Sequence, residues 1–527
     1  MAHSIAPLEA LSEWQDFCRQ AKQAEVNPKR VRLFPAASLT VDLSGQRYST
    51  ALETAANQLL QVRELRQWQT QLLNGEPINT TENRAAWHTM LRAPAPIAEV
   101  VKERERMNAF IRHADATRRW RHIVHIGIGG SDWGVRLTVN AFGYTKLWRN
   151  VRFVANIDGH AIASGTANLN PHDTLIVIAS KSFSTAETLL NAQRAIEWLQ
   201  SAGVTDPYSQ IVAVTANTEA AHAFGIPNTQ IFKLWDWVGG RFSVWSAVSL
   251  TTALAVNSDV VAGMHAGAAA MDQHFEEAPW ENNAPIQMAL AGLINRSVLG
   301  YGSLNIAPYD SRLSDLVPYL QQLEMESLGK SVDLEGNPIT VPTGPAVWGM
   351  PGTDAQHTFF QWLHQGSDGA PVDFIVCQGA DHQWLEHHQC LLANSLAQRE
   401  AMLVGKNYEQ ALNECLRQGH DPDTASWLAK HRVHQGGRPN TLIVLPRLSP
   451  YTLGALLALY EHKIAVQARI WGINPFDQWG VEYGKNLASG IIDEFKNPAQ
   501  NSHQRRTPDA STQHWIETFK RTMGKGS

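Results

Sequence analysis

The chain has 527 residues, of which 44% are hydrophobic and 18% charged, a composition that predicts a folded globular protein rather than a disordered one. Its 44 Lys and Arg residues and 49 Asp and Glu residues give a net charge of -5. This balance argues against nucleic-acid binding as the main function, because neutralising phosphates requires an excess of Lys and Arg. The four cysteines lack CxxC spacing, so no disulfide framework and no structural zinc site are expected. We find no signal peptide and no apolar run of about 20 residues, so we expect a cytoplasmic protein without a membrane partner.

The predicted elements change character along the chain. Residues 1–115 are predicted to be helical and polar, apart from a strand-like run at 38–43. Short apolar runs then alternate with helical stretches, a pattern typical of βαβ units with parallel sheets. The first set of strand candidates is 122–127, 151–156, 174–179 and 211–215. After an alanine-rich helical stretch at about 246–298, the second set is 303–307, 373–377, 441–445 and 468–472.

This alternation predicts an α/β fold with two domains. We expect an N-terminal helical segment at 1–115 that packs on the core, a first α/β domain at 116–275 and a second at 276–496. Residues 497–527 are polar and basic, and are expected to form a C-terminal tail or a helix that wraps another subunit.

A serine-rich segment, Ser180-Lys-Ser-Phe-Ser-Thr-Ala-Glu-Thr188, directly follows one predicted strand and enters a helix expected to run to about Leu199. Hydroxyl groups and unpaired backbone N–H groups at a helix N-terminus favour an anion, above all a phosphate. A single hydroxyl here would be explained by ordinary helix capping. Four hydroxyls and Lys181 within six residues favour a phosphate site instead.

Three further segments carry polar residues beside glycines or after strands. The turn Gly127-Ile-Gly-Gly-Ser-Asp132 follows the first strand of the alternating region, where open α/β sheets bind ligands, but it lacks the third glycine of a dinucleotide fingerprint. Val238-Gly-Gly-Arg-Phe-Ser243 presents Arg241 as an anion contact. The third segment is Phe476-Asp-Gln-Trp-Gly-Val-Glu-Tyr-Gly-Lys485, whose lysine taken alone is equally typical of a helix surface.

Together these segments identify a resemblance to the phosphoglucose isomerase family, from about Leu39 to about Glu494. Seven stretches match in family order: 78–84, 127–132, 180–185, 238–243, 321–330, 352–357 with 364–366, and 476–485. The resemblance implies two sugar-isomerase (SIS-type) domains, each a parallel-sheet α/β sandwich flanked by helices. It also implies a homodimer with shared active sites, and interconversion of glucose 6-phosphate and fructose 6-phosphate in glycolysis and gluconeogenesis, through a cis-enediol intermediate and without a cofactor or metal.

The resemblance also implies roles for individual residues. The phosphate-binding set is Ser131, Ser180, Lys181, Ser182 and Thr185. Arg241 is expected to stabilise the enediolate, Gln478 to orient it, and Lys485 to handle a proton at a ring or hydroxyl oxygen. The family's ring-opening histidine stands a few residues before a His-His pair, which here is His387-His388, so His382 is the prediction. Counting without a gap from the glycine loop leads to Asp381 instead.

Two positions depart from the family pattern. Where the family has Trp-Gly-Glu-Pro-Gly-Thr, with the Glu as the base, this chain has Trp348-Gly-Met-Pro-Gly-Thr353. A thioether cannot carry a proton near neutral pH, so the substitution at Met350 raises the prospect of an impaired isomerase. The sequence leaves open whether Asp354 or a water replaces the base. Leu328, where relatives carry Asn, is the second departure.

Two other functions were weighed. A non-catalytic sugar-phosphate-binding protein on the same fold is the alternative to the isomerase. A metal hydrolase is less favoured, because His387-His388 with Cys390 lacks the spacing of known metal motifs and no second ligand cluster is evident.

Overall fold

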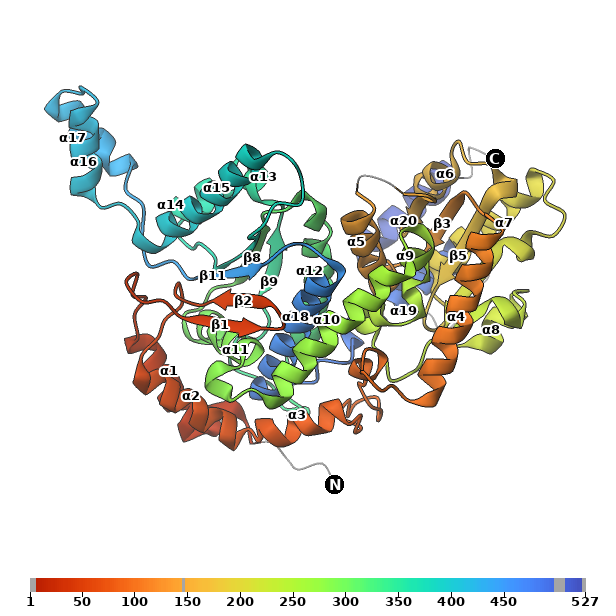
Figure 1. The fold of residues 1–527 in the computed structure, drawn as a ribbon, viewed down its shortest axis with the longest axis horizontal. Helices are drawn as coiled ribbons and strands as arrows, with labels where there is room; N and C mark the ends of the chain where they lie inside the picture. Colours follow the sequence, from red (N-terminus) through yellow and green to blue (C-terminus); the bar gives the residue numbers. More distant parts are fainter. Residues whose placement is uncertain (1–5, 145–146, 497–507, 524–527) are drawn as a thin grey trace. The chain divides into compact units, whose positions relative to one another are not determined.

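The computed structural model describes residues 6–144, 147–496 and 508–523 and divides into two compact units, Met1–Phe476 and Asp477–Ser527 (Figure 1). The second unit contains α19 (Trp479–Lys496) and α20 (Ala510–Met523). Of the predicted C-terminal tail, residues 497–507 and 524–527 lie outside the described residues, whereas 510–523 form a helix.

The first sheet of the larger unit has the predicted parallel βαβ arrangement. Its strand order is β4-β3-β5-β6-β7, and every neighbouring pair is parallel. Register places Ile123 between Val151 and Leu175. The strands are β3 (His122–Ile126), β4 (Asn150–Val154), β5 (Thr174–Ala179), β6 (Ile211–Thr215) and β7 (Ile231–Lys233), connected through α5 (Trp133–Phe142), α6 (Gly159–Thr166), α7 (Ala186–Ser201) and α8 (Thr218–Ala223). The short edge strand β7 was missed, since three residues carry too little pattern.

The second sheet is mixed, with the order β1-β2-β11-β10-β8-β9. The four strands β11, β10, β8 and β9 are parallel, whereas β2 runs antiparallel to both β1 and β11. Residues 33–42, in the N-terminal segment, therefore complete one edge of the second sheet. The strands are β1 (Leu33–Ala36), β2 (Leu39–Asp42), β8 (Ser303–Pro308), β9 (Ala346–Gly349), β10 (Val372–Cys377) and β11 (Asn440–Leu445).

The strand predicted at Ala468–Gly472 is wrong, because these residues end α18 (Pro450–Trp471). Almost every residue of this helix is buried, so it has no polar face and no helical periodicity from which to recognise it. Gly472 closes the helix at φ 78°, the left-handed conformation typical of a helix end. The helix packs along α10 (Ser258–Glu277), and this pair lies between the two sheets in Figure 1.

The remaining helices surround the sheets and the central pair. A two-helix projection, α16 and α17, extends beyond the second sheet in Figure 1. The helices are α1 (Ser12–Gln23), α2 (Thr50–Val62), α3 (Leu65–Leu73), α4 (Ala98–Ala116), α9 (Leu250–Ala255), α11 (Ala284–Leu293), α12 (Leu316–Leu328), α13 (Gly352–Gln356), α14 (Phe360–Gln365), α15 (Leu385–Val404), α16 (Tyr408–Arg417) and α17 (Pro422–His431).

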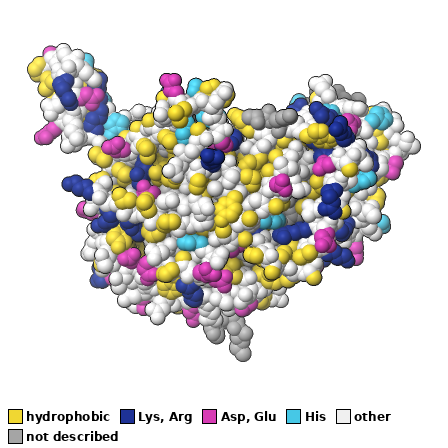
Figure 2. Space-filling view, in the orientation of Figure 1, with side chains coloured by type: hydrophobic (Ala, Val, Ile, Leu, Met, Phe, Trp, Pro, Cys, Tyr) yellow, Lys and Arg dark blue, Asp and Glu magenta, His cyan; other side chains and the backbone are white. Residues whose placement is uncertain are grey.

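Two surface properties follow from the described residues. None of their helices is long and apolar enough to cross a membrane. On the face drawn in Figure 2, basic and acidic side chains are interspersed.

Candidate active site

The glycine turn after β3 packs directly against the backbone of the Arg241 turn. A Cβ atom at Gly130 would lie 2.0 Å from the carbonyl oxygen of Gly240 and 2.6 Å from the nitrogen of Arg241, so only glycine fits. The Ser243 hydroxyl donates to the Gly130 carbonyl at 3.2 Å. His125 of β3 supports the turn from below, since its Nε2 lies 2.8 Å from the Ser131 carbonyl. Two of the predicted segments are therefore brought together.

Arg241 is held in place by contacts to two other segments of the chain. It is only 3% exposed, in the 3-10 turn Gly240–Trp245. Its Nε donates to the Ser327 hydroxyl of α12 at 2.7 Å, and its Nη2 donates to the Pro475 carbonyl. Its Nη1 forms a longer ion pair with Glu326 Oε2, at 3.6 Å. The guanidinium is thus fixed in position by contacts from α12 and from the segment that carries Pro475.

The serine-rich loop between β5 and α7 presents hydroxyls at a helix N-terminus. Thr185 is the N-cap of α7, yet its side chain makes no capping hydrogen bond, so ordinary capping does not account for it. Ser182 and Ser184 are exposed, and the Ser184 hydroxyl donates to that of Ser182 at 2.7 Å. The loop is anchored by buried Phe183, which adopts φ 49°. The hydroxyls and the helix N-terminus are therefore arranged as an anion site requires.

Lys181 links this loop to the Arg241 segment. Its Nζ donates to the carbonyls of Asp236 at 2.9 Å and Val238 at 2.8 Å, just before Gly239. Burial, reinforced by the nearby positive charge of Arg84, lowers the pKa of Lys181 to about 8. The lysine is therefore charged at neutral pH but loses its charge under mildly alkaline conditions.

One group of site residues was not predicted. Asn474 donates to Asn79 Oδ1 at 2.9 Å and to the Thr81 hydroxyl at 2.8 Å, which ties the loop 78–84 to the segment that carries Pro475. The pairing therefore positions the segment whose Pro475 carbonyl accepts from Arg241, and the loop whose Arg84 charge helps to lower the pKa of Lys181. The sequence did offer one signal for this group, because residues 78–84 match the family. That match gave no role to any single residue.

The histidine candidate lies at the end of the second sheet. His382 is exposed in the loop after β10, where its Nδ1 accepts from the Trp384 backbone and its ring centroid lies 6.1 Å from that of His388. The competing residue, Asp381, is bound by Arg312 at 2.6 Å. The described contacts of His382 thus join it to its own loop and to the start of α15, whereas Lys181 follows a strand of the first sheet.

Gln478 and Lys485 belong to the second unit, at the start of α19. The Gln478 carbonyl accepts from Val481 N at 3.2 Å, and Lys485 Nζ lies 3.3 Å from Glu482 Oε1. Their predicted roles stay predictions.

Met350 follows β9, and its side chain contributes to packing. It is partly buried against an apolar cluster that includes Tyr309, Phe360 and Phe374. Asp354 lies exposed on α13, where its backbone carbonyl accepts from the Thr358 hydroxyl at 2.9 Å. Leu328, the other departure, is fully buried at the end of α12.

A separate network of buried charges lies beneath the Arg241 turn. Arg92 is bound by Asp272, at 2.7 and 2.8 Å, and by Glu461. Trp245, which ends the Arg241 turn, donates to Glu461 Oε1 at 2.8 Å. Burial alone would raise the pKa of Asp272, but Arg92 holds it at about 2. This network braces the turn from the core.

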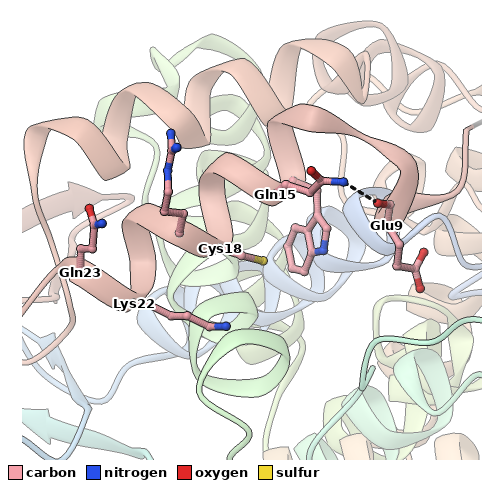
Figure 3. A pocket seen from close by; sticks show the side chains of 7 residues that line it. Glu9, Gln15, Cys18, Lys22 and Gln23 are labelled. Atoms are coloured by element: carbon pink, nitrogen blue, oxygen red, sulfur yellow. Dashed lines mark hydrogen bonds between the residues drawn. The ribbon is translucent and has the colours of Figure 1, made fainter.

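A pocket on α1 contains none of the predicted site residues (Figure 3). Gln15 Nε2 donates to the Glu9 carbonyl at 3.3 Å across it, and the Glu9 carboxylate accepts from Thr340 N at 2.8 Å. Burial raises the pKa of Cys18 to about 11, so its thiol is protonated and unreactive. We therefore place the candidate active site at the Arg241 cluster and not in this pocket. Within 6–144, 147–496 and 508–523, no group of three or more His, Cys, Asp or Glu side chains is arranged to hold a metal ion.

Comparison with known proteins decides the family. The family model "Phosphoglucose isomerase" matches residues 42–516. The chain belongs to the phosphoglucose isomerase family. It is 54% identical to a glucose-6-phosphate isomerase of Bordetella pertussis over 98% of this chain and 99% of the relative, and 42% identical to one of Caulobacter vibrioides over 92% of each. A crystal structure of a glucose-6-phosphate isomerase from Chlamydia trachomatis superimposes with a TM-score of 0.84 at 29% identity, covering 97% of this chain and 99% of that one.

These comparisons confirm the predicted family, the α/β sugar-isomerase fold and the isomerase function. They give no support to the impairment considered for Met350 or to the non-catalytic alternative. The residue-level roles and the domain boundaries stay predictions.

Proposed function

We propose that the protein is a glucose-6-phosphate isomerase that interconverts glucose 6-phosphate and fructose 6-phosphate. The observation that carries the proposal is the gathering of the glycine turn, the Arg241 turn and the Lys181 loop, in a chain of this family. The reaction would serve glycolysis and gluconeogenesis.

In this proposal the substrate phosphate binds at the N-terminus of α7. The exposed Ser182 and the N-cap Thr185 donate hydrogen bonds, with Ser180 and Ser131 at the margins. Lys181 adds positive charge while its ammonium bonds to the Asp236 and Val238 carbonyls. The helix dipole and these donors together favour the phosphate dianion.

The isomerisation moves a proton between C1 and C2 of the open-chain sugar. Arg241, fixed by Ser327 and Pro475, supplies positive charge where the enediolate oxygen develops. We assign ring opening to His382, a proton at a ring or hydroxyl oxygen to Lys485, and orientation of the intermediate to Gln478. No cofactor is needed, because the substrate is both oxidised and reduced.

We further propose a cytoplasmic homodimer in which each active site contains residues of both subunits. The placement of His382 at the end of the second sheet, with contacts to its own loop, is consistent with a histidine that acts on a partner's site.

The test is a coupled assay of glucose 6-phosphate formation from fructose 6-phosphate with the purified full-length protein. We expect turnover at a rate that scales with protein concentration. An R241K variant purified identically controls for contaminating host isomerase. A wild-type rate equal to that of the variant would contradict the proposal.

A further inference from the structure

The proposed reaction needs a base that removes a proton from carbon beside the positive group that stabilises the enediolate. Met350 has no ionisable group, and its side chain is engaged in packing against an apolar cluster. The base therefore has to be found among the carboxylates around Arg241.

Glu326 is a carboxylate in contact with Arg241. Glu326 lies on the last turn of α12, and its Oε2 is 3.6 Å from Arg241 Nη1. Its side chain is 23% exposed, so it is neither sealed in the core nor fully solvated. A carboxylate with this exposure can be reached by a small molecule from solvent.

Three other carboxylates in the neighbouring segments are held by basic or amide side chains. Glu324, two residues earlier on α12, is fully buried and bound by Lys463 at 2.7 and 2.9 Å. Asp132 is bound by Arg136 at 2.9 Å. Glu82 accepts from Asn79 at 2.6 Å and pairs with Arg84.

Neighbouring contacts fix Glu326 relative to the site. Gln322 Nε2 donates to Glu326 Oε2 at 3.1 Å, and a Cβ atom at Gly129 would lie 2.9 Å from that same nitrogen. Ser327, the next residue, receives the hydrogen bond from Arg241 Nε. Gln321 Nε2 donates to the Val347 carbonyl at 2.9 Å, three residues before Met350. Glu326 thus stands between the Arg241 guanidinium and the glycine turn.

We propose that Glu326 is the catalytic base, an inference that rests on the isomerase function proposed above. Its carboxylate takes the proton from C2 of the open-chain aldose, and the C2–H electron pair forms the C1=C2 double bond. The carbonyl electron pair moves to O1, where Arg241 stabilises it. Glu326 then returns the proton to C1 as O2 loses its own proton, which reaches O1 through water, so that C2=O forms and the carboxylate is regenerated.

The main test is E326Q in the full-length protein. Gln keeps the size and an acceptor oxygen for Arg241 but cannot carry the proton. We expect kcat to fall by about 10²–10⁴-fold, with the KM for fructose 6-phosphate changed by less than about threefold. The acid limb of the pH–kcat profile should disappear, a change that a merely positioning residue would not cause.

Two control variants and one chemical-rescue experiment complete the test. E335Q, at an exposed loop carboxylate, and D354N are expected to retain kcat within about twofold. E326A is expected to regain activity with added formate or acetate, which also covers a failure of E326Q to fold. Retention of more than a tenth of kcat by E326Q, or a loss in D354N equal to that expected for E326Q, would overturn the assignment. So would an E326A variant that no carboxylate rescues. An inactive wild-type protein would instead refute the proposed isomerase function.

Discussion

The two arginine centres of the larger unit show how the same charge can serve structure or chemistry. Arg92, in the core, is fully buried and bound at hydrogen-bond distance by two carboxylates, the fully buried Glu461 and the partly buried Asp272. Arg241 is equally buried, and its partners include the Ser327 hydroxyl, the Pro475 carbonyl and, at the longer distance of 3.6 Å, the Glu326 carboxylate. The core centre holds the structure together, whereas in the proposed reaction the site centre stabilises the enediolate and has the Glu326 carboxylate beside it.

A substitution in the Arg92 network should cause the largest effect, and the quantity affected should be the free energy of unfolding. E461Q removes one of the two charges that balance Arg92 and leaves the guanidinium buried with Asp272. Breaking a buried ion pair costs about 3–5 kcal/mol of folding free energy. The urea midpoint of unfolding, followed by tryptophan fluorescence, measures the loss.

The control for this variant is E197Q, which removes an exposed partner of Arg194 on α7. It is expected to change stability by less than about 0.5 kcal/mol. Equal midpoints for the two variants would show that the core pair is not structural.

Changing the site centre should reduce catalysis instead of stability. R241K keeps one positive charge but loses the planar group that reaches Ser327, Pro475 and the substrate together. We expect kcat/KM to fall by about 10²–10³-fold, or about 2.7–4 kcal/mol, as for removal of an oxyanion donor. The measurement is steady-state kinetics beside the urea midpoint. A large drop in midpoint with little kinetic change would reverse the contrast between the two centres.

The smallest expected effect is the pH dependence of substrate binding at the proposed phosphate site. Lys181 has its pKa lowered to about 8 by burial, so it is protonated below pH 8 and becomes neutral above it. Its attraction for the phosphate dianion is therefore lost as the pH rises. We expect the KM to increase above pH 8, by at most about tenfold per pH unit. In K181R the guanidinium stays charged, and the alkaline rise should disappear; a rise that persists in K181R would assign the effect to another group.

Much of the fold was accessible from sequence because its signals are local. The apolar runs at 174–179 and 211–215 are strands with those bounds, and the hydroxyls after β5 do mark a helix N-terminus. The predictions failed where every face of an element is buried, or where the residues that pair are far apart in the sequence. Ala468–Gly472 reads as a strand because α18 has no polar face. The strand at 39–42 lies within the strand-like run predicted at 38–43. Its pairing with β11 could not be predicted, because the two strands are about 400 residues apart and a local pattern does not indicate such a partner.

The site shows the same division. Lys181, Arg241 and the glycine turn stand in recognisable segments, so their types and spacing indicated anion chemistry before the fold was known. The contact between Arg241 and Glu326 could not be predicted, since it depends on how α12 meets the turn at 240–245. On α12 itself Glu326 looks like any residue of a solvated helix face. Its neighbour Glu324 looks the same in sequence but is buried against Lys463.

The most direct measurement is the initial rate of glucose 6-phosphate formation from fructose 6-phosphate by wild-type protein and by E326Q at equal concentration. The account predicts steady turnover by the wild type, with Met350 in place, and a rate at least about 100-fold lower for E326Q. Equal rates for the two proteins, whether both high or both at background, would contradict it.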